Sequence, residues 1–255
     1  MASNPPSQCC TVGVKHDGEP TGKLIKIGGI DAYVAEPTGK TVHKDTAILY
    51  IPDVIGIWKN SQLMVDQFAA NGYYTIIPDI FNGDAMSLNR PDDFDLMGWL
   101  AKGSDGKNPH TVEAVDPIVQ KSIKYLKEQG FKKIGGVGYC FGAKYIIRFM
   151  PKGKGIDVGY VAHPSTPVSS MNPNSVPSKA LSLSPPPKLT KSSRLRNVTS
   201  QKKILAETKQ PYQINLYSGV VHGFSVRGDP SIKHEKFARE KAFLQAVQWF
   251  DEYLI

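Results

Sequence analysis

Short, continuous apolar runs recur along this chain, and segments with helical spacing lie between them. Runs that are rich in β-branched residues, such as TAILYIP over 46–52, are typical of strands buried on both faces of a sheet. The pattern predicts strands over 46–52, 73–78, 133–139, 156–162 and 213–217, and helices over 61–70, 112–129, 143–150 and 236–253. Strands that alternate with helices indicate an α/β fold with a mostly parallel sheet flanked by helices. A hairpin is expected over 24–36, around Gly28 and Gly29.

The length of 255 residues is suited to a single α/β domain over 1–255. Residues 82–110 are rich in Gly, Asp, Asn and Pro, which indicates a long excursion with one short helix. The chain has no apolar run long enough for a bilayer span, and MASNPPSQCC lacks the basic and then apolar profile of a signal peptide. We therefore expect a cytoplasmic protein with no membrane partner. Cys9 and Cys10 are expected to have no role, with metal or redox chemistry as the alternative.

The net charge of +8 comes from one segment. Residues 166–203 hold seven Lys or Arg and no Asp or Glu, so they account for all but one unit of that charge. The same 38 residues hold nine Ser and six Pro but no aromatic residue. Proteins that bind single-stranded nucleic acid interleave aromatic and basic residues, so we expect no nucleic-acid partner. The segment is expected to be irregular.

The stretch GYCFG, residues 138–142, follows a predicted strand and precedes a predicted helix. In this setting the pattern predicts a nucleophile elbow, with Cys140 lifted above the sheet on a sharp turn. The start of the helix favours the thiolate, and the N–H of Phe141 would face a substrate oxyanion. The alternative is a buried core cysteine beside a glycine-rich turn. The strand–turn–helix context favours the nucleophile.

A cysteine nucleophile needs a base, and His222 follows the last predicted strand, in YSGVVHGF. We expect the polar segments around the other histidines to leave them solvated, and His163, at a strand end, to line the pocket. The solvated set is His16, His43, His110 and His234. Val54, after the strand over 46–52, is expected to supply a second oxyanion N–H.

Together these motifs resemble the dienelactone hydrolase family, in its fungal branch. The resemblance covers about residues 10–165 and 203–255, and includes the cysteine elbow, PDV-G at 52–56, PDIF at 78–81 and YSGVVHGFSVRGD at 217–229. It implies an α/β-hydrolase fold and a carboxymethylenebutenolidase-like cleavage of lactones or esters, without metal or cofactor. By this resemblance Cys140 is the nucleophile and His222 the base. Asp53 stands where bacterial members place a glutamate beside the resting thiol, and Arg227 loosely matches an arginine that binds a substrate carboxylate.

The family's triad aspartate is missing from this sequence, because the region after AHPS contains no Asp or Glu. One interpretation is a genuine basic insertion. We favour the hypothesis that residues 166–203 are a shifted reading of the gene. Codons built from the last base of one codon and the first two bases of the next turn PPPKLT into Ala-Ala-Ala-Glu-Thr-Asp. The aspartate then falls at the codon of Thr190.

The sequence therefore predicts a hydrolase of activated esters or dienelactone-like lactones, weakened by the lost acid. The expected partner is a small lactone or ester, and the expected assembly is a monomer or dimer. The alternative is a degenerate hydrolase-fold protein that only binds a ligand. Proline is poorly tolerated in a sheet interior, so the three prolines at 185–187 are expected to disturb the central sheet.

Overall fold

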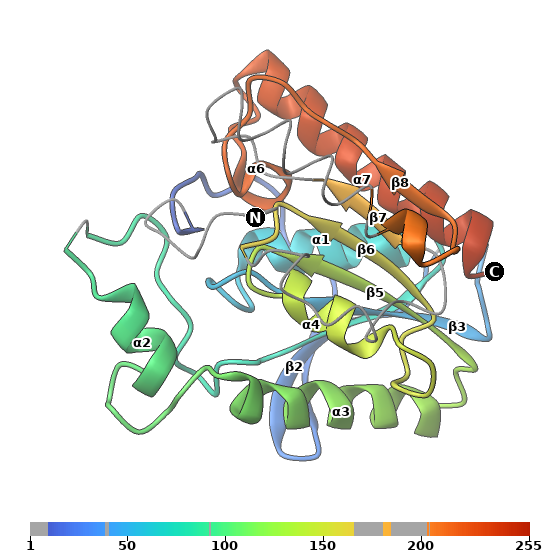
Figure 1. Cartoon of the computed structure of the whole chain (residues 1–255), viewed down its shortest axis with the longest axis horizontal. Helices are drawn as coiled ribbons and strands as arrows, with labels where there is room; N and C mark the ends of the chain where they lie inside the picture. The colour runs from blue at the N-terminus through green and yellow to red at the C-terminus, as the bar shows by residue number, and fades with distance from the viewer. Residues whose placement is uncertain (1–9, 39–40, 92, 166–180, 185–202, 204) are drawn as a thin grey trace.

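The structure is a computed structural model that describes residues 10–38, 41–91, 93–165, 181–184, 203 and 205–255 (Figure 1). Its centre is one eight-stranded sheet with the strand order β1-β2-β4-β3-β5-β6-β7-β8. The strands are β1 (Lys23–Ile27), β2 (Ile30–Ala35), β3 (Thr46–Ile51), β4 (Tyr74–Pro78), β5 (Lys133–Tyr139), β6 (Val158–Ala162), β7 (Leu181–Ser184) and β8 (Tyr212–Ile214).

The sheet is parallel over most of its width. The hairpin β1–β2 is antiparallel, and β2 pairs antiparallel with β4. All pairings from β4 to β8 are parallel. This confirms the predicted mostly parallel sheet and the hairpin at its edge. The carboxyl ends of β3, β5 and β6 consequently lie next to one another, at the edge where α/β sheets place their sites.

Helices cover both faces of the sheet (Figure 1). They are α1 (Lys59–Ala70), α2 (Leu96–Lys102), α3 (Val112–Glu128), α4 (Ala143–Phe149), α6 (Phe224–Arg227) and α7 (Lys233–Tyr253). Side chains of a strand alternate between the faces, and β3 is buried on both. Leu49 belongs to the core shared with α3 and α4, whereas Ile48 and Tyr50 belong to the core shared with α1 and α7. This double burial explains why the strand reads as one apolar run.

The predicted disturbance of the sheet by the three prolines at 185–187 concerns residues outside the described ones, but β7, directly before them, is paired. Backbone pairing joins β7 in parallel to β6 on one side and to β8 on the other, so the sheet is continuous across this position. The strand is formed by LSLS, which ends immediately before the three prolines. The hypothesis of a shifted reading over 166–203 is a statement about the gene, and of those residues the structure describes only 181–184 and 203.

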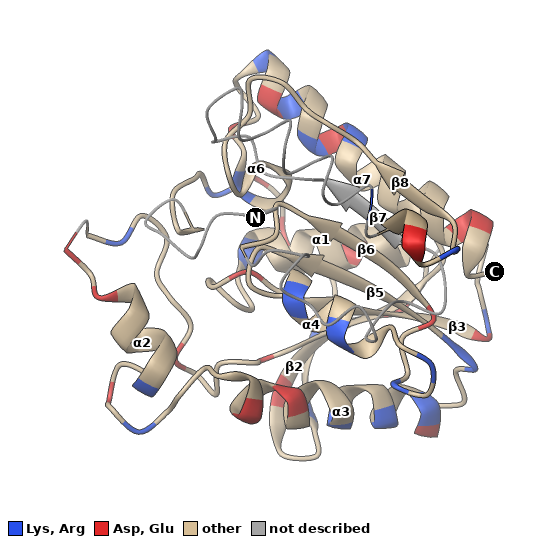
Figure 2. Ribbon diagram, in the orientation of Figure 1, with Lys and Arg blue, Asp and Glu red and all other residues tan. Residues whose placement is uncertain are grey.

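Other elements differ from the prediction mainly at their ends. β8 is only three residues long, although a strand over 213–217 was expected, and β6 begins at Val158. The excursion over 82–110 does contain one short helix, α2, whose N-terminus is capped by the Asp95 carboxylate through the N–H of Gly98 at 2.8 Å. Within the described ranges, no helix combines the length and the apolar character that crossing a bilayer requires. Both signs of charge alternate along α7 (Figure 2).

Candidate active site

Cys140 lies on a tight turn between β5 and α4, as the elbow motif predicts. Its φ angle is +52°, in the left-handed region that a residue with a side chain adopts rarely. The turn is fastened to the next strand, because the N–H of Cys140 donates to Ala162 and its carbonyl accepts from the N–H of Ser165, both at 3.2 Å. Such strain persists only where surrounding structure fixes it, and it clusters at functional sites.

Gly142 makes this turn sterically possible. A Cβ atom at this position would lie 2.2 Å from the carbonyl oxygen of Ile51 and 2.6 Å from that of Pro52. Both are backbone atoms of the end of β3 and the residue after it, so they cannot swing away as a side chain would. The second glycine of the motif therefore allows the start of α4 to pass directly over the end of β3.

His222 meets the cysteine from a different part of the chain. It follows β8 by a loop and immediately precedes α6, and its Nε2 atom is 3.1 Å from Sγ of Cys140. Both side chains are buried, with exposed fractions of 5% and 0%. The structure thus brings together the two residues predicted to be base and nucleophile, at hydrogen-bonding distance for a sulfur.

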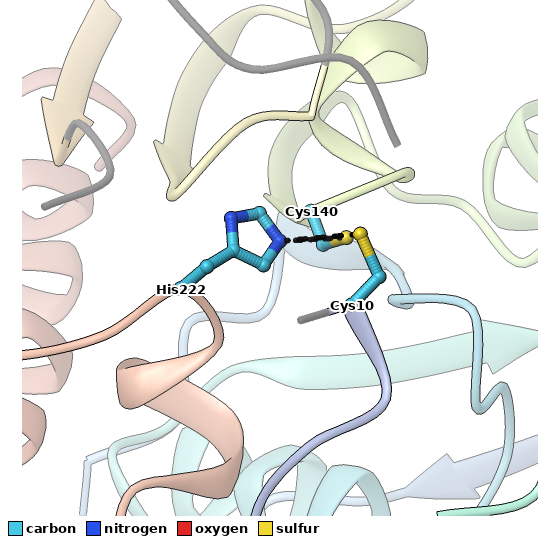
Figure 3. A group of neighbouring side chains, drawn as sticks. All are labelled: Cys10, Cys140 and His222. Carbon is cyan, nitrogen blue, oxygen red and sulfur yellow. Dashed lines mark hydrogen bonds between the residues drawn. The ribbon is translucent and has the colours of Figure 1, made fainter. Parts of the chain in front are cut away.

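Cys10 lies against this pair, although the sequence predicted no role for it. Its Sγ atom is 3.7 Å from Nε2 of His222, and its side chain is 1% exposed, as in a core residue. Figure 3 shows the three side chains pointing toward one another from three separate segments. A separation of 212 positions from His222 left no sequence signal for this contact. Cys9 lies outside the described residues.

The segment that carries Cys10 is fastened on both sides. Asn89 accepts from the N–H of Gly13 and donates its side-chain N–H to the carbonyl of Gly13, each at 3.0 Å. On the other side, the N–H of Val14 donates to the carbonyl of Arg227 at 3.0 Å, and Arg227 Nε donates to the carbonyl of Val12 at 3.2 Å. The start of the described chain is therefore bound to the histidine loop.

Asp53 and Arg227, predicted to contact substrate, form a buried ion pair with each other. Nη1 of Arg227 donates to Oδ2 of Asp53, and the side chains are 0% and 1% exposed. Burial disfavours the charged guanidinium, but the charges of Asp53, Cys140 and Cys10 outweigh it and hold the pKa of Arg227 above its ordinary value. Asp53 also accepts from the N–H of Ile55 at 3.1 Å, which fixes the loop after β3.

The two N–H groups predicted for the oxyanion hole belong to residues beside the cysteine. Phe141 follows Cys140 directly, and Val54 lies in the loop after β3, where its carbonyl accepts from the N–H of Met86 at 2.8 Å. Among the described residues, neither N–H donates to another group. Both N–H groups are therefore without an acceptor in the described part of the chain.

His163 stands beside His222 at the end of β6. Its φ angle is +38°, its side chain is fully buried, and the two imidazole centroids are 5.0 Å apart in an edge-on arrangement. Neither ring nitrogen has a hydrogen-bond partner among the described residues. Burial, followed by the charges of His222 and Arg227, holds the pKa of His163 well below its ordinary value. The ring is therefore neutral at neutral pH.

Two of the histidines predicted to be solvated are buried. Nε2 of His16 donates to the carbonyl of Gly228 at 2.8 Å, which adds another tie between the N-terminal segment and the histidine loop. His110 contacts the Asp84 carboxylate at 2.9 Å and packs against Trp99 with ring centroids 4.2 Å apart. The prediction failed because both residues lie in polar sequence but bind partners distant in the chain.

No carboxylate among the described residues is hydrogen-bonded to His222. The candidate site is accordingly a Cys–His pair, with a second cysteine on one side and a neutral histidine on the other. Thr190, where the hypothesis of a shifted reading puts the aspartate, lies outside the described residues.

Comparisons with known proteins agree with this architecture. The sequence profile of the dienelactone hydrolase family matches residues 30–254. Hydrolase tropI of Talaromyces stipitatus is 42% identical, with 100% of this chain and 99% of the relative covered. Dienlactone hydrolase 1 of Gibberella moniliformis is 34% identical, with 100% and 96% covered. Among solved structures, a dienelactone hydrolase from Anabaena variabilis superposes with a TM-score of 0.61 over 94% of this chain and 100% of that chain, at 11% identity. This last likeness concerns the fold alone, which is an α/β-hydrolase fold.

Proposed function

The chain belongs to the dienelactone hydrolase family, and from this premise we propose that it cleaves an activated ester or lactone with Cys140 as the nucleophile. Family membership supports a hydrolase of the lactone or ester type. The identity of the nucleophile, its partners and the choice of an activated substrate form the proposal.

The observation that carries the proposal is the contact between Cys140 and His222. Sγ and Nε2 are 3.1 Å apart, which is the reach that proton transfer needs. The thiol sits on a strained turn at the carboxyl edge of a parallel sheet, as nucleophiles of this fold do. A cysteine of purely structural use would need neither the strain nor the imidazole.

Acylation begins when His222 Nε2 takes the proton from Cys140 and the thiolate attacks the substrate carbonyl carbon. The N–H groups of Phe141 and Val54 donate to the oxygen that becomes negative. When the carbonyl re-forms, the leaving oxygen departs and takes the proton from His222. A thioester on Cys140 remains. In deacylation, His222 removes a proton from water, and the resulting hydroxide attacks the carbonyl carbon of the thioester. The C–S bond then breaks, the acid product leaves, and the thiolate of Cys140 takes the proton back from His222.

The choice of sulfur limits the substrate class. A thiolate is nucleophilic at a modest pKa, but it is also a good leaving group. With an amide or an unactivated ester, the tetrahedral intermediate would expel the thiolate again. An enol lactone releases a stabilised enolate, so the reaction goes forward. We therefore propose activated lactones and esters as substrates.

Arg227 and Asp53 are proposed to bind the substrate. Because the two form an ion pair with each other, a substrate carboxylate that binds Arg227 must replace Asp53 as its partner. Exchange of one carboxylate for another keeps the buried guanidinium neutralised, whereas leaving it unpaired would be costly. The pair thus provides a preference for anionic substrates.

The absence of a carboxylate on His222 predicts slow turnover. In serine triads, loss of the acid costs roughly 10⁴-fold in kcat because the imidazole loses its correct tautomer and the support of its positive form. A Cys–His pair depends less on the acid, since thiolate and imidazolium already stabilise each other. We therefore propose a functional but impaired dyad.

Complete burial of Cys140 favours a second candidate, a degenerate hydrolase that only binds its ligand. Substrate can reach Sγ only if a neighbouring residue gives way. Alkylation by iodoacetamide distinguishes the candidates: a thiolate maintained by His222 reacts rapidly even in mildly acidic buffer, whereas a permanently enclosed thiol reacts slowly.

The direct test is hydrolysis of an activated aryl ester and of a dienelactone by wild type, Cys140→Ala and Cys140→Ser. We expect Cys140→Ala to lose all turnover above background, and Cys140→Ser to retain a small fraction. Cys9→Ser serves as the matched control for loss of a thiol and should retain wild-type turnover. Equal rates for wild type and Cys140→Ala would rule out the proposed nucleophile.

For residues 166–203, we propose that the coding DNA was read in a shifted frame. β7 ends at Ser184, and the family's acid follows this strand, close to Thr190. Sequencing of the gene across residues 165–203 in close relatives tests the proposal. A compensating pair of insertions and deletions is expected, and an uninterrupted frame with the same basic residues would contradict it.

A further inference from the structure

We propose that Cys10, Cys140 and His222 together form a binding site for a thiophilic divalent cation, for which Zn²⁺ is the type ion. The three ligand atoms are the two Sγ atoms and Nε2, and each side chain is buried. Figure 3 shows all three atoms converging on one point between the segments that carry them. Thiolate and imidazole are the ligands that zinc prefers in proteins.

The distances between the donors are close to those of a tetrahedral zinc site. Zn–S bonds of about 2.3 Å and Zn–N bonds of about 2.0 Å place sulfur and nitrogen about 3.5 Å apart, and two sulfurs about 3.8 Å apart. Nε2 of His222 is 3.1 Å from Sγ of Cys140 and 3.7 Å from Sγ of Cys10. All three atoms lie within 4.8 Å of one another. A bound ion therefore requires shifts of at most about 1 Å.

The local charges also suit a divalent ion. Two thiolates and a neutral imidazole carry a charge that one such cation neutralises. The guanidinium of Arg227, which lies beside them, is already neutralised by Asp53. With the metal bound, this buried centre has no net charge, which is the condition under which burial of ions is tolerated.

The backbone holds Cys10 in position for this role. Val12 and Val14 are hydrogen-bonded to Arg227 in the histidine loop, and the carbonyl of Thr11 accepts from the N–H of Asn89 at 2.9 Å. The third ligand is therefore delivered by a segment that is already attached to the element carrying His222. A site preorganised in this way loses little conformational entropy when the ion binds.

The ligand set predicts which metal ions bind and how their binding affects the proposed hydrolysis. Two sulfurs and one nitrogen favour Zn²⁺ and Cd²⁺ over Mg²⁺ and Ca²⁺, which prefer oxygen. Binding takes up the sulfur and the nitrogen that the proposed hydrolysis uses, so the metal-bound protein cannot form the thioester. This consequence rests on the proposed function, whereas the site itself rests on geometry alone. Binding also releases thiol protons, so affinity should rise with pH.

The test uses Co²⁺ as a spectroscopic probe, added to the reduced, metal-free full chain. We expect one equivalent to bind with the thiolate-to-cobalt absorption of a sulfur-ligated site and the visible bands of tetrahedral Co²⁺. Zn²⁺ should displace it stoichiometrically, and Mg²⁺ should not. Binding without the thiolate band, or no binding at micromolar protein, would overturn the proposal.

Variants identify the ligands. Cys10→Ser should weaken Zn²⁺ binding by at least about 100-fold. Loss of a residue that only contacts a ligand, without binding the metal itself, weakens metal affinity by about 100-fold at most, so a larger effect identifies a direct ligand. Cys9→Ser, the adjacent thiol, should bind as wild type does. Circular dichroism of Cys10→Ser checks that the variant is folded. A folded Cys10→Ser with wild-type affinity would eliminate the proposed site.

A protection experiment separates this proposal from the proposed function. Zn²⁺ should slow alkylation of Cys140 by iodoacetamide, as measured by mass spectrometry of its peptide, and chelation by EDTA should restore the rate. Neither measurement depends on turnover. If Zn²⁺ binds and protects while no ester is hydrolysed, only the proposed function fails. If esters are hydrolysed but Zn²⁺ gives no protection, only the metal site fails.

Discussion

Two neighbouring strands, β5 and β6, end in the same rare backbone conformation but lead to different chemistry. Tyr139 and Ala162, their last residues, are paired in register. The next residue on each strand is left-handed, with φ of +52° at Cys140 and +38° at His163. The two turns are joined by the backbone hydrogen bonds from Cys140 to Ala162 and from Ser165 to Cys140.

The two turns differ in what surrounds the strained residue. Cys140 is followed by Gly142 and a helix, and it has an imidazole nitrogen 3.1 Å from its sulfur. His163 is followed by Pro164 and Ser165, and its ring nitrogens contact no polar group of the described chain. Backbone strain at a strand end therefore marks the neighbourhood of the site. Of the two side chains, only that of Cys140 has a hydrogen-bond partner among the described residues.

The largest effect should come from filling the space beside Gly142, on which only the turn at Cys140 depends. Gly142→Ala would press a methyl group against the backbone carbonyl of Ile51, 2.2 Å away. The backbone of the turn at Cys140 or of the end of β3 would have to shift, so we expect a loss of more than about 4 kcal/mol in the free energy of unfolding. Urea denaturation followed by circular dichroism measures it.

Ser165→Ala is the matched change on the other turn. Its hydroxyl is buried without a partner among the described residues, so its removal should change the free energy of unfolding by less than about 1 kcal/mol. Similar losses for Gly142→Ala and Ser165→Ala would show that the two turns do not differ as the geometry indicates.

The second effect concerns the neutral ring of His163. Burial keeps its pKa well below the ordinary value of 6.5, so the folded state does not bind the proton that the unfolded state takes up below that pH. Acid therefore favours unfolding. Above about pH 6.5, His163 does not lower the free energy of unfolding. Below that pH, the free energy of unfolding falls by about 1.4 kcal/mol per pH unit until the pKa of His163 in the folded state is reached.

His163→Asn should remove this slope, because Asn does not titrate and tolerates the left-handed conformation. The measurement is the difference in the free energy of unfolding between variant and wild type, followed by urea denaturation from about pH 7.5 to about pH 5.5. The difference should shift in favour of the variant by about 1.4 kcal/mol between about pH 7.5 and about pH 5.5. Curves that stay parallel would mean that the buried ring takes up a proton in the folded state.

The smallest effect isolates the strain at Cys140. Both Cys140→Ala and Cys140→Gly lack the thiol, but only glycine adopts a φ of +52° without steric cost. We expect the glycine variant to exceed the alanine variant by about 1 kcal/mol in the free energy of unfolding. Thermal unfolding of the two proteins measures the difference. A more stable alanine variant would indicate that the turn relaxes once the sulfur is removed.

The regular part of the fold could be predicted from the sequence because burial on two faces leaves a simple pattern. TAILYIP became β3, and GYCFG between a strand and a helix became the elbow. The order of Cys140 and His222 along the chain also sufficed to pair them. β7 escaped prediction because LSLS is short and stands beside prolines, while its pairing comes from neighbours on both sides.

The site itself was only partly predictable. Contacts between residues far apart in the chain leave no local pattern, and Cys10 beside His222 is one such contact. The polar surroundings of His16 and His110 pointed to solvent, but each binds a distant group in the interior. Asp53 and Arg227 were both predicted to contact substrate, but their pairing with each other follows only from the three-dimensional arrangement.

The hydrogen bonds between the segment around Val12 and Arg227, at the end of α6, also bear on how the protein is made. Synthesis on a ribosome proceeds from the amino end, and domains fold as units as they emerge. Cys10 and Cys140 are translated long before their imidazole partner, and the sheet cannot receive β8 until residues 212–214 have left the exit tunnel. The nascent polypeptide therefore carries unpaired thiols throughout elongation, and the contact between Cys140 and His222 forms in one late step.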